Sequence, residues 1–260
     1  MNKKGYTLIG LGLILYCINI SIPFIGIGMN KLSMTFLPAS AIASFILLAI
    51  GVRKVNIYRN DFKTASILFY VTAGLIVLAS MLLPLLSKNA FDQLFDLYYE
   101  ILSSNTTVDL DETYLYIIIN IFKGTNQYIM LLFITEIIAA VGTFIMLKGI
   151  SKEKINIVHL SKLNKSGKKT VIFNLITMVV SMMMIKLMNN IFSTILEYGA
   201  NSDVEIIINY FALLVIMPAI VVFAILTLVN RIKYIICIFK TPTNMIVEKE
   251  EEEVVDSTEE

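Results

Sequence analysis

Long apolar runs alternate with short polar segments along almost the whole chain. Six of these runs approach the about 20 residues that a helix needs to cross a bilayer. They cover residues 6–29, 35–52, 64–86, 127–147, 170–192 and 206–229. The pattern therefore predicts an all-α polytopic membrane bundle of six transmembrane helices, contained within residues 1–240.

The longest polar connection, residues 87–126, carries two further apolar patterns. In residues 91–102 the large apolar side chains recur at helical spacing, which is typical of an amphipathic helix. They are Phe91, Leu94, Phe95, Tyr98 and Leu102. Residues 114–122 are apolar but too few to cross a bilayer. We therefore expect interfacial helices in this extracytoplasmic loop.

The composition supports a membrane protein rather than a soluble one. Hydrophobic residues make up 57% of the chain and charged residues 16%, whereas soluble domains have about 45–50% and about 25%. The mean hydropathy is +0.78. Cys17 and Cys237 lie in different segments, so they form neither a metal-type spacing nor a disulfide framework.

Lysine and arginine are distributed very unequally between the two sides that six spans would create. One side receives Lys3, Lys4, Arg53, Lys54, Arg59, Lys63, Lys148, Lys152, Lys154, Lys162, Lys165, Lys168, Lys169, Arg231, Lys233, Lys240 and Lys249. The other receives Lys31, Lys88 and Lys123. Because short cytoplasmic loops are rich in lysine and arginine, both termini are predicted to be cytoplasmic. The abundant Ile, Lys and Asn suggest a bacterial cytoplasmic membrane.

The end of the chain differs from the rest. Residues 241–260 are dominated by Glu and Asp, including a run of four glutamates at 250–253. Such a segment cannot bury enough apolar area to fold alone. We therefore expect a disordered acidic cytoplasmic tail.

Glu136 is the most informative residue for function. It lies 12 residues before Lys148, about 18 Å along a helix and therefore close to the middle of the bilayer. An isolated charge there costs about 2.5–3.5 kcal/mol on insertion scales. Glu136 is accordingly protonated, paired or facing water. It predicts either a proton- or cation-handling site or a neutral, hydrogen-bonded structural acid.

Lys186 is the second intramembrane charge. It lies 17 residues after Lys169, nearer the outer surface than Glu136. The favoured interpretation is that its ammonium group extends to the outer interface beside Asn189 and Asn190. The alternative is an ion pair with Glu136 on a neighbouring helix.

A proline, a histidine and a group of methionines are the other residues with a possible functional role. Pro218 near the middle of the sixth span removes one backbone donor and predicts a helix kink. His159 is the single histidine and is expected to be solvated or interfacial. The fifth span is rich in methionine, which could serve a copper route, but flexible apolar packing is the favoured interpretation. These methionines are Met178, Met182, Met183, Met184 and Met188.

The chain carries no P-loop, GxSxG, HExxH or dinucleotide-binding motif. We therefore expect no enzymatic activity, no cofactor and no metal site. The membrane topology accounts for the basic groups without nucleic-acid binding. The expected partners are the lipid bilayer and, at the cytoplasmic loop 148–169, a partner subunit or ATPase.

Two functions remain open from the sequence. The first is a non-enzymatic membrane protein that moves or senses a small solute or ion, or serves as an accessory subunit. The second function rests on a resemblance. In its size, its number of spans and the side of its termini, the chain resembles ABC-2-type permease subunits. That resemblance implies the membrane subunit of an ATP-driven exporter. A lipid-modifying enzyme is disfavoured because no His, Asp or Ser-plus-base cluster lies at the interfaces.

Overall fold

The computed structural model describes residues 3–21, 31–56, 58–103, 112–153, 155–198 and 203–244. Its elements are α-helical apart from one short 3-10 helix. They are α1 (Lys3–Ser21), α2 (Lys31–Val55), α3 (Asn60–Ser103), α4 (Glu112–Ser151), α5 (Ile157–Tyr198), α6 (Asp203–Lys240) and η3 (Thr241–Asn244). The predicted all-α class is confirmed for these residues.

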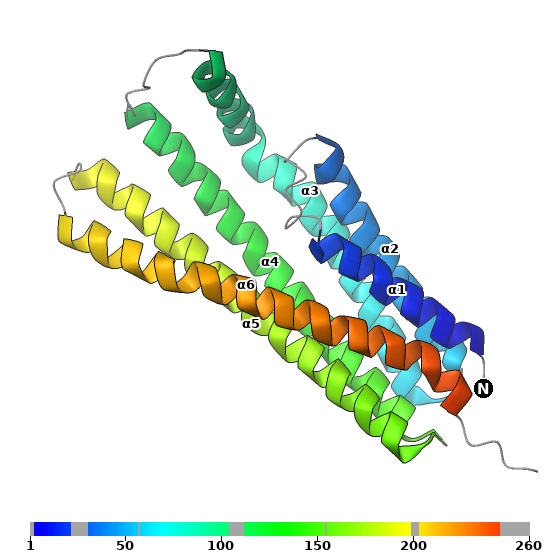
Figure 1. Ribbon diagram of the computed structural model, residues 1–260. Helices are drawn as coiled ribbons and strands as arrows, with labels where there is room; N and C mark the ends of the chain where they lie inside the picture. Colours follow the sequence, from blue (N-terminus) through cyan, green and yellow to red (C-terminus); the bar gives the residue numbers. More distant parts are fainter. Residues whose placement is uncertain are drawn as a thin grey trace, which may run out of the picture.

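The helices run alternately up and down, and each packs against the next along the chain. α1 also packs against α6, so the six helices pack in a closed ring. Figure 1 shows the start of α1 and the end of α6 at the same end of the bundle, where the helices lie close together. Toward the other end they fan out.

α1 and α2 approach so closely that their backbones nearly touch. A Cβ on Gly51 would lie 2.8 Å from the amide nitrogen of Ile9 and 2.9 Å from the carbonyl oxygen of Gly5. Further along the same interface, the Ser44 hydroxyl donates a 2.8 Å hydrogen bond to the Gly12 carbonyl. Small residues drive helix association in lipid because they permit this approach. Ser40, four residues before Ser44 on α2, is buried as well.

The long connection between the third and fourth spans differs from the sequence-based expectation. α3 is one helix of 44 residues and α4 one helix of 40 residues, or about 66 and 60 Å at the helical rise. Residues 91–102 are thus the last turns of α3, and residues 114–122 belong to the first turns of α4. The prediction of separate interfacial helices is wrong for these residues. Extending a helix adds one hydrogen bond per residue, whereas a separate helix needs a new nucleus.

Two further stretches that the sequence analysis placed outside the spans belong to helices, one at the start of α5 and one after α6. α5 begins at Ile157 rather than near residue 170, so most of the expected basic loop is helix. Residues 241–244, which the sequence analysis assigned to the tail, pack on the bundle, because Thr241 is fully buried and the Asn156 amide donates a 3.0 Å hydrogen bond to the Asn244 carbonyl. The rest of the predicted acidic tail, residues 245–260, lies outside the described residues.

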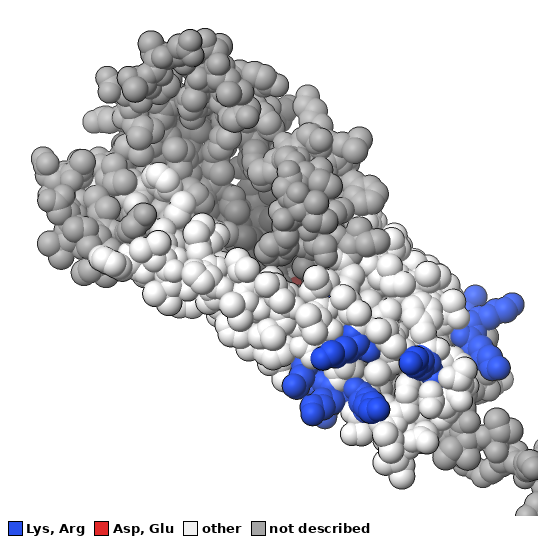
Figure 2. Space-filling model, in the orientation of Figure 1, with Lys and Arg blue, Asp and Glu red and all other residues white. Residues whose placement is uncertain are grey.

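Five helices are long and apolar enough to cross a membrane: α2, α3, α4, α5 and α6. α1 is described only as far as Ser21, and the remainder of the first predicted span lies outside the described residues. Six spans therefore remain a prediction. Figure 2 shows lysine and arginine side chains gathered toward the end of the bundle where α1 begins and α6 ends; we call it the basic end.

Candidate functional site

A small cavity lies inside the bundle beside Glu136. Its volume is about 40 Å³, and its walls come from α1, α2, α4, α5 and α6. Most of the wall is apolar or small. The ionisable and amide side chains that line it are Tyr16, Glu136, Asn174, Arg231 and Tyr234.

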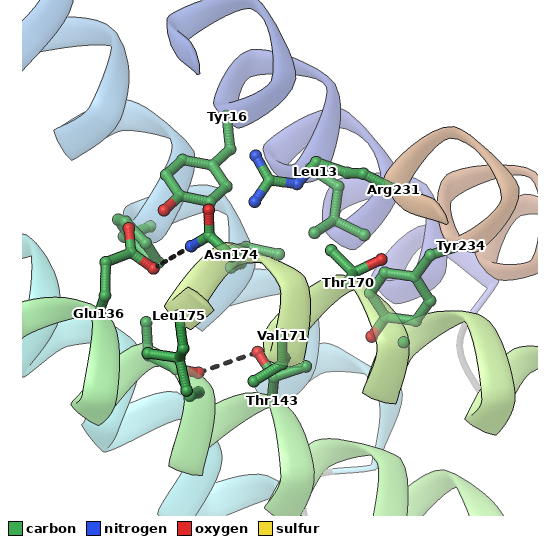
Figure 3. A pocket seen from close by; sticks show the side chains of 15 residues that line it. Leu13, Tyr16, Glu136, Thr143, Thr170, Val171, Asn174, Leu175, Arg231 and Tyr234 are labelled. Carbon is green, nitrogen blue, oxygen red and sulfur yellow. Dashed lines mark hydrogen bonds between the residues drawn. The ribbon is translucent and has the colours of Figure 1, made fainter. Parts of the chain in front are cut away.

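Glu136 is partly buried on α4 and has a polar partner on the adjacent helix. The side-chain amide of Asn174 on α5 donates a 2.8 Å hydrogen bond to its Oε2 atom, drawn as a dashed line in Figure 3. Asn174 is a short polar residue in an otherwise apolar run. The bond therefore stabilises the carboxyl group and joins α4 to α5 within the bundle.

Arg231 lies on the opposite side of this cluster and is 3% exposed. Its guanidinium carbon is 4.2 Å from the centre of the Tyr16 ring, a cation–π contact between α6 and α1. The guanidinium also interacts with the Cys17 thiol and, electrostatically, with Glu136. Figure 3 shows Arg231 facing the Tyr16 ring, with Glu136 and Asn174 beyond it. A guanidinium group and a carboxyl group thus share one interior cluster.

The sequence analysis counted Arg231 with the cytoplasmic lysines, and the structure shows its side chain buried inside the bundle. α6 continues to Lys240 instead of ending near residue 229. Residues three, four and seven positions after Arg231 then share its helix face. These residues, Tyr234, Ile235 and Ile238, are buried as well, while Lys233 is exposed. That spacing was a readable sign of an inward arginine.

Two polar atoms at the cavity have no hydrogen-bond partner among the described residues. They are Nε of Arg231 and the hydroxyl oxygen of Tyr234, and both residues line the cavity. Leaving a buried polar group unpaired costs about 1–3 kcal/mol. A small occupant that accepts hydrogen bonds would recover part of this cost.

Lys186 does not lie near this cluster. It is exposed on α5, 12 residues beyond Asn174, which is about 18 Å along the helix. The structure therefore brings Glu136 together with Asn174 and Arg231 and leaves the Lys186 side chain exposed on the surface of the bundle. Pro218 lies within α6, which continues on both sides of it; the kink itself stays a prediction.

His159 is buried rather than solvated, so the expectation for this residue is wrong. Its Nε2 atom lies 3.1 Å from the hydroxyl of Thr241, and the 3-10 helix that begins there packs on α6 and α1. Because α5 begins at Ile157, His159 lies in its first turn and faces η3. No cluster of three or more His, Cys, Asp or Glu side chains able to hold a metal occurs within the part of the chain that the structure describes.

Ion pairs and hydrogen bonds link the α2–α3 connection to the α4–α5 connection at the basic end of the bundle. Arg59 and Glu153 form a 3.2 Å ion pair, and Lys152 pairs with Asp61. Arg59 also donates to the backbone carbonyls of Gly149 and Lys152. These contacts join the α2–α3 connection to the α4–α5 connection. They also fix the first residues of segment 148–169, where the sequence analysis expected a partner to bind.

The helices that the structure describes are compatible with a membrane protein, since five can span a bilayer by length and composition. Comparisons with family models, curated proteins and solved structures find no match. The functional inference therefore rests on the cluster around Glu136 and Arg231.

Proposed function

We propose that the protein is a non-enzymatic membrane protein that moves a proton or a small ion through the cluster of Glu136 and Arg231. One observation carries the proposal. A carboxyl group from α4 and a guanidinium group from α6 line the same small cavity inside the bundle. Ionisable side chains are costly within a membrane, and they typically mark ion pathways and proton relays.

The arrangement supports a coupling between protonation and helix packing. An ionised Glu136 partly compensates the buried charge of Arg231, with which it interacts electrostatically. Protonation of Glu136 removes that compensation and leaves a buried cation beside Tyr16. A buried charge without a counter-charge is strongly destabilising. Proton uptake would therefore favour a different position of α6 relative to α1 and α4.

The competing interpretation is a neutral glutamic acid that only holds helices together. The Asn174 bond is compatible with that interpretation, because an amide can donate to a neutral carboxyl oxygen. The buried arginine favours the functional one, since a permanently neutral Glu136 would leave it without a carboxylate in the cavity wall.

The size of the cavity narrows the class of solute. A cavity needs about 10–15 Å³ to hold one water molecule, so 40 Å³ accommodates a few waters or one small ion. A larger organic solute would require the helices to separate. The geometry therefore supports protons and small ions more than metabolites.

We also propose that both termini face the cytoplasm of a bacterial cell, with the basic end of the bundle on that side. The gathering of lysine and arginine in Figure 2 supports this orientation. Single cysteines at positions 109 and 202 should react with an impermeant reagent added outside intact cells, and a cysteine at position 162 should not. Labelling of position 162 from outside would contradict the orientation.

The function itself is tested by proton flux in proteoliposomes. The purified full-length protein is reconstituted with a pH-sensitive dye in the lumen, and a potassium diffusion potential drives the flux. We expect wild-type vesicles to change pH faster than empty vesicles, and Glu136→Gln to reduce the rate to that of empty vesicles. Gln keeps the shape and hydrogen bonding but cannot titrate.

Glu153→Gln is the matched control. It makes the same chemical change at a carboxylate that pairs with Arg59 at the basic end, away from the cavity. It should keep the wild-type rate. Equal rates for wild type and Glu136→Gln would contradict the proposal. The alternative of an ABC-2-type exporter subunit stays a prediction, and no feature of the described residues favours it specifically.

A further inference from the structure

A second, larger hollow lies at the basic end between the first turns of α5 and the last turns of α6. We call it the α5–α6 groove. Its volume is about 860 Å³. It is lined by Asn156, Val158, His159, Lys162, Lys165, Ser166, Lys169, Asn230, Lys233, Ile236, Cys237, Lys240 and Asn244. It shares no residue with the cavity at Glu136.

The charge of the groove is strongly positive. Lys162, Lys165 and Lys169 follow one another on α5 at spacings that place them along one helix face. Lys233 and Lys240 line the groove from α6, and no carboxylate contributes to the wall. The ion pairs between described residues involve other side chains, at the two connections. Five lysines therefore line the groove without a described counter-charge.

Neutral donors and apolar side chains complete the lining. Asn156 and Asn230 place side-chain amides beside the lysines, while the Ser166 hydroxyl donates to the Lys162 carbonyl of its own helix. Val158 and Ile236 are 64% and 47% exposed at the same groove. On the membrane side of the groove, exposed aliphatic residues continue along both helices at Ile172 and Val229. A charged recess thus leads directly onto an apolar surface.

We propose that the α5–α6 groove binds the phosphate headgroup of an anionic phospholipid, with the acyl chains on the exposed aliphatic side chains of α5 and α6. Basic pockets between membrane helices on the cytoplasmic side are suited to such headgroups. A free phosphate ion would use the lysines but not the apolar surface. A peptide whose side chains are only acidic would likewise not use the apolar surface.

The protein's own acidic segment is the competing occupant. Its first glutamate, Glu248, lies only four residues after Asn244, which lines the groove. Charge alone does not distinguish this segment from a lipid. The exposed aliphatic surface next to the lysines favours the lipid, and deletion of residues 245–260 separates the two.

The test measures binding of fluorescent phosphatidylglycerol to the purified full-length protein in a neutral detergent. The groove variant carries Lys165→Gln, Lys169→Gln and Lys233→Gln together. Its control carries Arg53→Gln, Lys54→Gln and Lys63→Gln, three exposed cations at the same end of the bundle but outside the groove. We expect the groove variant to bind at least roughly tenfold more weakly and the control to change less than about twofold.

Three arms distinguish the sources of the anion. Unlabelled phosphatidylglycerol should displace the probe, whereas phosphatidylcholine and inorganic phosphate should not at matched phosphate concentration. Deleting residues 245–260 should leave the affinity within about twofold. Equal losses in the groove and control variants, displacement by inorganic phosphate, or a manyfold gain on deletion would each overturn the proposal, the last by identifying the acidic segment as the occupant.

Discussion

The first three helices and the last two are packed in different ways. Within an apolar 18-residue stretch of each spanning segment, 50% of the residues in α2 and 39% in α3 are buried inside the chain. In the corresponding stretches of α5 and α6 the buried share is 11% each. The first half is therefore held by close contact between helices. The second half presents most of its surface to lipid or to another protein.

The difference reflects the residues available to each half. In lipid the hydrophobic effect does not drive helices together, so association depends on close packing and polar contacts. Gly5, Gly12, Gly51 and Ser44 supply close packing between α1 and α2. α5 and α6 carry large side chains instead, and polar contacts tie them to the rest: the Asn174–Glu136 bond and Arg231 over Tyr16. The interior charges thus lie where the two halves meet.

The largest expected effect is in the close-packed half. Gly51→Leu places a side chain where even a Cβ would collide with the backbone of Ile9 and Gly5. Helix backbones cannot move apart without breaking the interface, so the change should exceed the about 1–3 kcal/mol of ordinary overpacking. We expect loss of most folded protein, measured as monodisperse yield in size-exclusion chromatography.

Gly74→Leu is the control for this prediction. Gly74 is exposed, with no atom within 4 Å of an added Cβ, so the same residue change should keep the wild-type yield. If both variants were recovered equally well, the close-packed half would not depend on backbone contact at Gly51.

A smaller effect is expected where the two halves meet. A double-mutant cycle with Glu136→Gln and Arg231→Gln should show a coupling of about 1 kcal/mol in the free energy of unfolding, because the two groups interact inside the bundle. The same cycle with Glu136→Gln and Lys186→Gln should give less than about 0.5 kcal/mol. Coupling to Lys186 that equals or exceeds the coupling to Arg231 would reverse the assignment.

The comparison also clarifies what the sequence could predict. Apolar run lengths were enough for the helical class and for where most helices lie, because a bilayer requires backbone groups to be satisfied within a helix. Glu136 was found because a carboxylate in an apolar run is conspicuous. The helices extend beyond the predicted span bounds at residues 86, 127, 170 and 229, because a helix can continue where the apolar pattern stops.

The placement of Arg231 in the same cavity wall as Glu136 was not predicted, for the same reason. Arg231 follows the apolar run directly, so its position indicated a cytoplasmic loop. Continuation of α6 carried its side chain inward instead. Asn174 gave little signal because one amide in a membrane helix is common. Which face of α5 meets α4 depends on packing between helices, which the periodicity of either helix alone does not specify.

An effect of similar size is expected at residues 241–244, which pack on α6 and α1. Truncation after Asn244 should leave the midpoint of thermal unfolding unchanged. Truncation after Lys240 removes buried Thr241, the partner of His159, and the Asn244 carbonyl, and should cost about 1–2 kcal/mol. Equal midpoints for the two truncated proteins would show that residues 241–244 contribute nothing to the fold.

Proton exchange at Glu136 is the central claim, and infrared difference spectroscopy tests it most directly. Wild type and Glu136→Gln are compared in lipid bilayers while the external pH is cycled between alkaline and acidic values. We predict that acidification of the wild type adds a protonated-carboxyl band and removes a carboxylate band, reversibly, and that both changes are absent from the variant. Identical difference spectra for the two proteins would show that Glu136 does not exchange a proton and would contradict the account.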